Sequence, residues 1–304
     1  MATATATESK SAVRDIELWV FRVVWLVLPF TAFPLLTRAL EQGGRGLEVG
    51  GTIVLWVIWA GLLIATMVPR TETLTAVRII APMALAASVV AAITLLDDDS
   101  VATVLILGLI STGIAGVLAF HPAVSDAFVN GSSYGDERRF LLTTPGAIMA
   151  GPIQLVWAAI AFGSTVGPIL LLAERWILGG IALVIGWPLA YLALPVLHRL
   201  SNRWLVFVPA GMVVQDKTAL REPQLFRKTG ITALGPAPID SPHEDLTLNS
   251  TGLALRVELI EPSKIVKNQR GGETELTDIG GFLVRPNRPG KVISAANERG
   301  FQIG

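Results

Sequence analysis

Long apolar runs without charged residues dominate the chain before about residue 200. Six of them have the length of a membrane-spanning helix, and they cover about 18–40, 49–68, 77–96, 101–120, 147–173 and 176–197. About 20 apolar residues in a helix cross the roughly 30 Å hydrocarbon core of a bilayer. The pattern therefore predicts a membrane α-helical bundle of six transmembrane helices at 18–198, after a short N-terminal tail at 1–17.

After residue 199 the pattern changes to short runs in which apolar and polar residues alternate, as they do in strands. Residues 204–208 and 212–214 lie on either side of Pro209-Ala210-Gly211 and predict a hairpin. Further expected elements are a second hairpin of 246–248 and 253–259, a strand at 281–284 and a short helix at 294–299 that Gly300 ends. Residues 199–304 are therefore expected to form a small, mainly-β cytoplasmic domain.

Three stretches of this region carry a pattern found in a known group of domains: WLVFVPAGMVV (204–214), LFRKTGITALGP (225–236) and FLVRPNRPGKVISAANERG (282–300). With them, residues 200–304 resemble the bacterial membrane-attached pleckstrin-homology-like domains. The resemblance implies a small curved sheet or barrel that binds lipid headgroups or proteins and is not used for catalysis. No family is recognised in the transmembrane region.

Composition and charge add an orientation to this picture. Of the 304 residues, 52% are hydrophobic and 16% are charged. One side of the expected bundle carries Lys10, Arg14, Arg70, Arg78, Arg138, Arg139, Arg199 and Arg203, and the other carries Arg38, Arg45 and Arg175. Since basic residues near span ends are retained in the cytoplasm, both termini are expected there. No cleaved signal peptide is expected, and the richness in Ala, Gly and Val suggests a high-GC bacterium and its plasma (inner) membrane.

Small residues four apart allow two helices to approach closely in lipid. The third apolar run carries Ala84, Ser88 and Ala92 at this spacing, and the fourth carries Gly108, Thr112 and Gly116. These two spans are therefore predicted to form a close antiparallel pair.

The longest expected cytoplasmic connection is the segment 121–145, between the fourth and fifth spans. Val124, Ala127 and Phe128 are spaced as on one face of a short helix that could lie on the membrane surface. The segment then carries a dense charge cluster of Asp136, Glu137, Arg138 and Arg139. The two arginines are either ordinary cytoplasmic anchors of the spans or contacts to an anionic headgroup or a partner, and both interpretations stay open.

The linker between the sixth span and the first expected strand is short, so the β domain must lie near the membrane surface. We expect the 121–145 segment to meet the domain there. The acidic residues Asp136 and Glu137 would face basic residues of the domain, among them Arg221, Arg227 and Lys228. Exposed ion pairs contribute only about 0–1 kcal/mol each, so apolar residues of the segment such as Phe128, Phe140 or Leu141 are expected to stabilise the contact against the sheet.

Residues suited to catalysis or metal binding are sparse in this sequence. The chain has no cysteine, which excludes disulfides, thiolate metal sites and a cysteine nucleophile. The histidines His121, His198 and His243 stand singly, without metal-ligand spacing. No catalytic residue, metal, cofactor or nucleic-acid partner is expected. In the fifth span, Gln154, Ser164 and Thr165 lie near Gly-Pro steps and could line a cavity, although a kinked packing helix is the simpler interpretation.

These patterns favour a non-enzymatic membrane protein that serves as an accessory subunit or scaffold of a larger membrane complex. Its expected partners are the lipid bilayer and a membrane protein or a second copy of the chain. A transporter or channel subunit that uses the fifth span is the alternative, and an enzyme acting on lipid headgroups is a third hypothesis.

Overall fold

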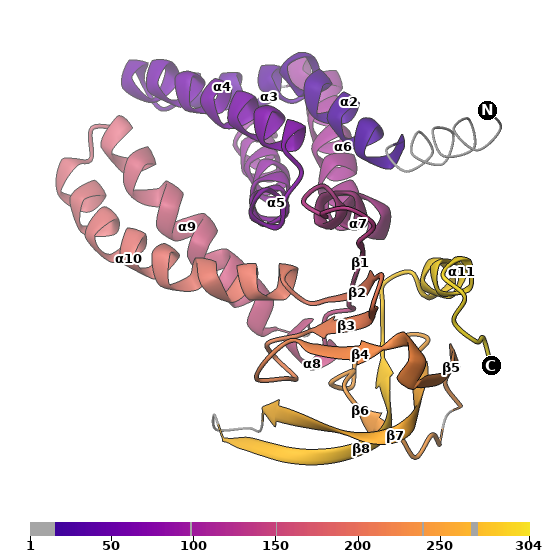
Figure 1. Ribbon diagram of the computed structural model, residues 1–304. Coiled ribbons are helices and arrows are strands. Elements are labelled where there is room, and N and C mark those ends of the chain that lie inside the picture. Colours follow the sequence, from indigo (N-terminus) through magenta and orange to yellow (C-terminus); the bar gives the residue numbers. More distant parts are fainter. Residues whose placement is uncertain (1–15, 98, 150, 239, 269–272) are drawn as a thin grey trace. The chain divides into compact units, whose positions relative to one another are not determined.

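The computed structural model describes residues 16–97, 99–149, 151–238, 240–268 and 273–304 (Figure 1). The chain divides into two compact units, which are described separately. The helical unit holds the residues up to Gly131 and Leu155–Leu197, and the β unit holds Ser132–Gln154 and His198–Gly304. Most of the expected N-terminal tail at 1–17, with Lys10 and Arg14 of the orientation argument, lies outside the described residues.

Six helical segments among the described residues are long and apolar enough to cross a membrane. They are α2 (Ile16–Thr31) continued by α3 (Phe33–Glu41), α4 (Arg45–Met67), α5 (Thr71–Thr94), α6 (Ala102–Ala119), α9 (Pro152–Leu172) and α10 (Trp176–Ser201). Each coincides with one of the six predicted runs, which confirms the expected helices. The chain is thus a multi-pass membrane protein with a small sheet-rich region after its last span.

Proline shapes the contact between α2 and α4. Pro29 has no N–H, so the Trp25 carbonyl lacks the helical donor four residues further on. The indole N–H of Trp59 in α4 donates to this carbonyl at 2.8 Å, and the Trp25 indole donates to the Trp59 carbonyl at 3.0 Å. Two reciprocal hydrogen bonds therefore join the helices, and one of them uses the acceptor that the proline leaves available.

Helices α5 and α6 pack against each other, as their stripes of small residues predict. Ser88 of α5 and Thr112 of α6 are completely buried. The third helix at this contact is α3: a Cβ added at Gly108 would lie 2.7 Å from a methyl carbon of Leu35. The stripe on α6 therefore accommodates α3 as well as α5.

Helices α9 and α10 approach most closely where two glycines meet. A Cβ at Gly163 of α9 would lie 2.4 Å from the carbonyl oxygen of Gly186 in α10. A Cβ at Gly167 would lie 2.9 Å from the backbone nitrogen of Leu183. Since these neighbours are backbone atoms, side chains at either position would push the two helices apart.

The segment after α6 forms α7 (Pro122–Asn130), which confirms the predicted short helix. The ring Nδ1 of His121 accepts a hydrogen bond from the backbone N–H of Ala123 at 3.3 Å and caps its first turn. Val124 and Phe128 are completely buried inside the helical unit, where α7 packs against α2, α5 and α6. The expectation that this apolar face lies on the membrane surface is therefore wrong, because neighbouring helices cover it.

Among its described residues, the β unit contains two four-stranded sheets, two short α-helices and a 3₁₀ helix at Lys228–Gly230. The first sheet has the antiparallel order β1 (Arg138–Leu141), β2 (Trp204–Val208), β3 (Gly211–Gln215) and β4 (Gln224–Arg227). The second has the order β5 (Ile231–Pro236), β7 (Leu255–Asn268), β8 (Thr274–Val284) and β6 (Glu244–Asp245). The helices are α8 (Gly146–Met149) and α11 (Pro289–Glu298).

A single apolar core joins both sheets and α11. It includes Phe207 and Met212 of the first sheet, Leu255 and Phe282 of the second, and Val292 of α11, all completely buried. The predicted hairpin of β2 and β3 and the predicted C-terminal helix are both present. Gly300 follows the helix with φ of +71°, which suits glycine and confirms it as the stop.

The second predicted hairpin, of 246–248 with 253–259, is wrong. Strand β7 pairs with β5 and β8, and the residues before it form a turn. Leu248 and Asn249 have φ of 54° and 56°, the left-handed conformation that ends an extended chain. The alternation of apolar residues had marked β7 correctly, since Leu255 and Val257 are buried, but its partners lie elsewhere in the sequence.

Candidate interaction site

The first strand of the β unit comes from the segment between two membrane helices. β1 pairs with β2 from Arg138 opposite Phe207 to Leu141 opposite Trp204. The backbone N–H of Leu142 then donates to the Arg203 carbonyl at 2.9 Å. Along the chain, α9 and α10 lie between these two paired strands. Both ends of this helical hairpin therefore enter the same folded unit, and Ser132–Gln154 and His198–Gly304 must lie on one side of the membrane.

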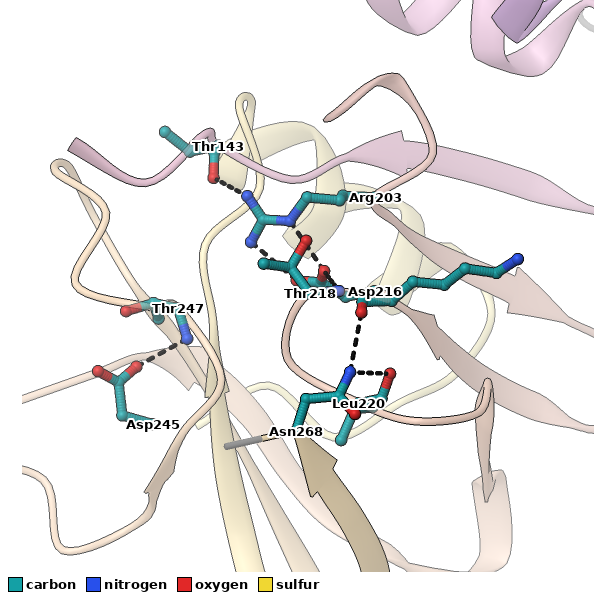
Figure 2. A network of polar contacts seen from close by, with 9 residues as sticks. Thr143, Arg203, Asp216, Thr218, Leu220, Asp245, Thr247 and Asn268 are labelled. Carbon is teal, nitrogen blue, oxygen red and sulfur yellow. Dashed lines mark hydrogen bonds and ion pairs between the residues drawn. The ribbon is translucent and has the colours of Figure 1, made fainter. Parts of the chain in front are cut away.

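A buried ion pair holds the end of this strand pair (Figure 2). The Arg203 guanidinium, just before β2, donates to both carboxylate oxygens of Asp216, through Nε at 2.9 Å and through an Nη at 2.7 Å. Each side chain is only 1% exposed. The other Nη donates to the carbonyl of Thr143 at 3.0 Å, and Asp216 also accepts from the backbone N–H of Thr218 at 2.9 Å. Arg203 thus ties the inter-span segment to the C-terminal segment.

The same turn is linked to the far end of β7. The Asn268 amide donates to the carbonyls of Lys217 and Leu220 at 2.8 and 3.1 Å. Its backbone N–H donates to the Ala219 carbonyl at 2.9 Å. The turn after β3 therefore joins both sheets, and the ion pair of Arg203 and Asp216 contributes to this connection within the domain.

A cluster of charged residues lies where the inter-span segment meets the end of α11. We name Asp136, Arg138, Lys228, Glu298 and Arg299 the β1–α11 corner. Arg138 forms an ion pair with Glu298 at 3.3 Å. Arg299 donates to the Asp136 carbonyl, and Lys228 donates to the Arg299 carbonyl at 2.6 Å. The corner thus brings together three parts of the chain that are far apart in sequence.

A second pair lies on the inter-span segment itself. Arg139 pairs with Glu137 at 3.0 Å and donates to the Ser132 hydroxyl at 3.0 Å. Its guanidinium also lies 5.4 Å from the centre of the Trp204 ring, within the range of a cation–π contact. Both groups of this pair remain partly exposed.

The structure shows where the six residues singled out from the sequence lie. Asp136, Arg138 and Lys228 meet at the β1–α11 corner, while Glu137 and Arg139 pair beside Trp204. Arg227, the last residue of β4, is exposed and lies opposite Gly211 in the register.

Sequence reasoning missed Glu298, Arg299 and Asp216 as members of these contacts. In the sequence, Glu298 and Arg299 were recognisable only as the polar end of a predicted helix, and no pattern marked Asp216. Arg203 was counted among the basic residues that flank the spans, whereas the structure buries it in the β unit.

Two of the polar residues singled out in the fifth span, Ser164 and Thr165, contact their own helix. The hydroxyls of Ser164 and Thr165 donate to the Ala161 carbonyl, at 3.3 and 2.6 Å. Within the described ranges, no group of three or more His, Cys, Asp or Glu side chains could hold a metal ion. These residues provide pairs of opposite charges that are partly exposed to solvent. They belong to a domain whose interior holds the buried ion pair of Arg203 and Asp216.

Comparison of the chain with protein-family models, curated proteins and solved structures gives no match. Its class therefore follows from its own structure: a multi-pass membrane protein whose sheet-rich unit is assembled from two separate segments of the chain.

Proposed function

We propose that this protein is a non-enzymatic scaffold or accessory subunit of a larger complex in a bacterial plasma membrane. The β unit is its binding domain on the cytoplasmic side, and the β1–α11 corner is the surface that contacts a membrane-protein partner. The observation that carries the proposal is the pairing of β1 with β2 on either side of the α9–α10 hairpin.

This pairing supports a scaffold because it limits how the domain can move. A domain on one linker can drift and rotate, since a flexible linker leaves its orientation free. Here the chain enters or leaves the β unit at three places, next to Gly131, Leu155 and Leu197. Three connections to the membrane helices leave a domain less freedom to drift than a single linker does, which suits docking of another membrane protein.

The strand order is further support for a pleckstrin-homology-like binding domain. Strands β1 to β4 follow one another in the first sheet, β5, β7 and β8 are antiparallel neighbours in the second, and α11 packs its Val292 into the shared core. The strands from β2 onward support the small curved sheet or barrel that the resemblance of 200–304 implies, while β1 comes from outside that region. The cytoplasmic side follows from the distribution of basic residues at the span ends.

Co-purification tests the proposal directly. The full chain, isolated in mild detergent from its own membranes, is expected to bring a membrane protein with it in a fixed ratio. The double variant Arg138→Ala with Lys228→Ala removes two cations of the corner and should lower the amount of partner. The matched control Lys217→Ala with Lys264→Ala removes two exposed cations elsewhere on the β unit and should retain it.

Two results would contradict the scaffold. One is a chain that purifies without any partner at a fixed ratio. The other is solute flux in proteoliposomes that depends on the fifth span, which would support the alternative of a transporter or channel subunit.

A further inference from the structure

A groove of about 390 Å³ lies along one face of α2 and α3, beside α4. The helix is interrupted at Ala32, between α2 and α3, and Pro29 and Pro34 flank this break. Proline is a usual cause of bends in helices. Both prolines line the groove, together with Phe33, Thr37, Arg38, Glu41 and Trp56 of α4. All of these residues belong to the helical unit.

The lining of this groove changes from apolar to charged along the span. On α2 and α3 it follows a four-residue spacing, through Pro29, Phe33, Thr37 and Glu41. The charged end coincides with the end of the span, at Glu41. In the apolar part, the Phe33 and Trp56 rings meet edge to face with their centres 5.0 Å apart. A phospholipid has the same polarity, with a charged headgroup at the bilayer surface and acyl chains in the hydrocarbon core.

Arg38 and Glu41 form the charged end of the groove. They are three residues apart on α3, a spacing at which opposite charges on a helix can pair. Among the residues that the structure describes, however, neither side chain takes part in an ion pair or a hydrogen bond. Both are exposed and both line the groove. The groove therefore presents a cation and an anion with which a bound molecule can pair.

We propose that this groove binds a phospholipid whose headgroup carries both a phosphate and a primary ammonium group, as phosphatidylethanolamine does. Arg38 donates to the phosphate, since the planar guanidinium offers paired N–H groups to its oxygens. Glu41 accepts hydrogen bonds from the ammonium group. An acyl chain of the lipid lies against Phe33 and Trp56. The site is separate from the β1–α11 corner of the proposed function.

The charges of the groove distinguish this headgroup from other phospholipid headgroups. Phosphatidylglycerol has a phosphate but no cation, so Glu41 would stay unpaired beside a second negative group. Phosphatidylcholine has both charges, but its methylated nitrogen has no N–H to donate to Glu41. A free phosphate ion would leave the apolar part of the groove without a ligand. Only the ammonium phospholipid matches the cation, the anion and the apolar wall together.

Native mass spectrometry of the full chain in detergent tests the site. The probes are phosphatidylethanolamine, phosphatidylglycerol and phosphatidylcholine with identical acyl chains, and phosphatidylethanolamine is expected to bind most tightly. Glu41→Gln should lower the affinity for phosphatidylethanolamine about three- to ten-fold, and it should not weaken phosphatidylglycerol. Arg38→Gln should weaken both lipids, because both carry the phosphate.

The matched control is the pair Arg45→Gln and Glu48→Gln. Arg45 and Glu48 are also three residues apart and exposed, and they lie in the first turn of α4, close after the end of α3. Neither of them lines the groove. Both variants should leave the three affinities unchanged.

Quenching of tryptophan fluorescence locates the bound lipid. Phosphatidylethanolamine with brominated acyl chains, added in detergent at a low ratio of lipid to protein, is expected to quench Trp56. Trp56→Phe keeps an aromatic ring in the groove and should remove much of this quenching. Trp187→Phe, in α10, is the control and should remove little, although Trp187 is 56% exposed and Trp56 is 46% exposed.

Three outcomes overturn the inference. The first is phosphatidylglycerol or phosphatidylcholine bound as tightly as phosphatidylethanolamine. The second is a pair of variants at Arg38 and Glu41 that weakens binding no more than the control pair does. The third is an equal loss of quenching in Trp56→Phe and Trp187→Phe. Failure here is distinct from failure of the scaffold proposal, because the co-purification test uses variants of the β1–α11 corner and leaves α3 unaltered.

Discussion

At the scale of single residues, burial decides what a charged side chain does in this protein. Arg138 and Arg203 are both arginines paired with a carboxylate in the β unit. The Arg138 side chain is 20% exposed and its partner Glu298 is 49% exposed, whereas both members of the Arg203 and Asp216 pair are 1% exposed. Water screens the first pair, while the second depends on its own hydrogen bonds to remain charged.

We therefore predict that Arg203→Met destabilises the β unit by about 3–5 kcal/mol, because it leaves the Asp216 carboxylate buried without its cation. Arg138→Met should lower stability by only about 0–1 kcal/mol. Combining Arg203→Met with Asp216→Leu should restore part of the loss, since both charges are then gone. Chemical unfolding of the full chain in detergent measures all three; equal losses for the two single variants would contradict the argument.

A second residue-scale prediction concerns the reciprocal tryptophan bonds. Trp59→Phe removes the donor to the Trp25 carbonyl and should lower stability by roughly 0.6–1.7 kcal/mol, the range for hydrogen bonds between membrane helices. Pro29→Ala supplies a backbone N–H to the same carbonyl. In the Pro29→Ala background, Trp59→Phe should therefore have a smaller effect. A double-mutant cycle on thermal unfolding measures this coupling, and strictly additive effects would show that the two donors do not share the acceptor.

At the scale of elements, close backbone contact joins α9 to α10. Gly163 lies against the Gly186 carbonyl, while a Cβ at Gly180 would meet nothing within 4 Å. Alanine favours helices by about 1 kcal/mol over glycine. Gly180→Ala should thus be neutral or stabilising, and Gly163→Ala should be destabilising because the helices must separate. Thermal unfolding monitored by tryptophan fluorescence distinguishes the two, and the prediction fails if both variants raise the melting temperature.

The pairing of β1 with β2 leads to a prediction about which fragment folds. Residues 202–304 alone lack β1, so one edge of β2 and the core side chain of Phe207 lose their cover. A fusion of 132–143 to 202–304 through a few Gly and Ser residues restores β1, because Leu142 and Arg203 are already hydrogen bonded. The fusion should unfold at a higher denaturant concentration than 202–304. A β-dominated circular dichroism spectrum is expected of the fusion, and equal midpoints would show that β1 adds no stability.

At the scale of the whole molecule, strand pairing restricts the membrane topology. Reporters placed near Tyr134 and after Gly304 should read the same side of the membrane, since both positions belong to the β unit. A reporter near Glu174, between α9 and α10, should read the opposite side. A reading of one side at all three positions would mean that α9 and α10 do not cross the bilayer.

Sequence by itself was sufficient for the features that depend on local pattern. The six spans, α7, the β2–β3 hairpin and the Gly300 stop all follow from neighbouring residues, because hydrophobic length, periodicity and glycine conformation are local properties. The charge cluster at 136–139 was also visible as a cluster.

Only the tertiary structure decided which distant segments meet. Strand β1 is four residues long and is separated from β2 by two membrane helices, so its partner cannot be read from nearby sequence. For the same reason the sequence alone placed Arg203 among the cations that flank the spans, whereas the structure shows it hydrogen bonded to Asp216 and Thr143. Burial and partners depend on contacts between residues far apart in the chain. The hydrophobic pattern of a segment indicates which of its residues are buried, but it does not indicate which other segment covers them.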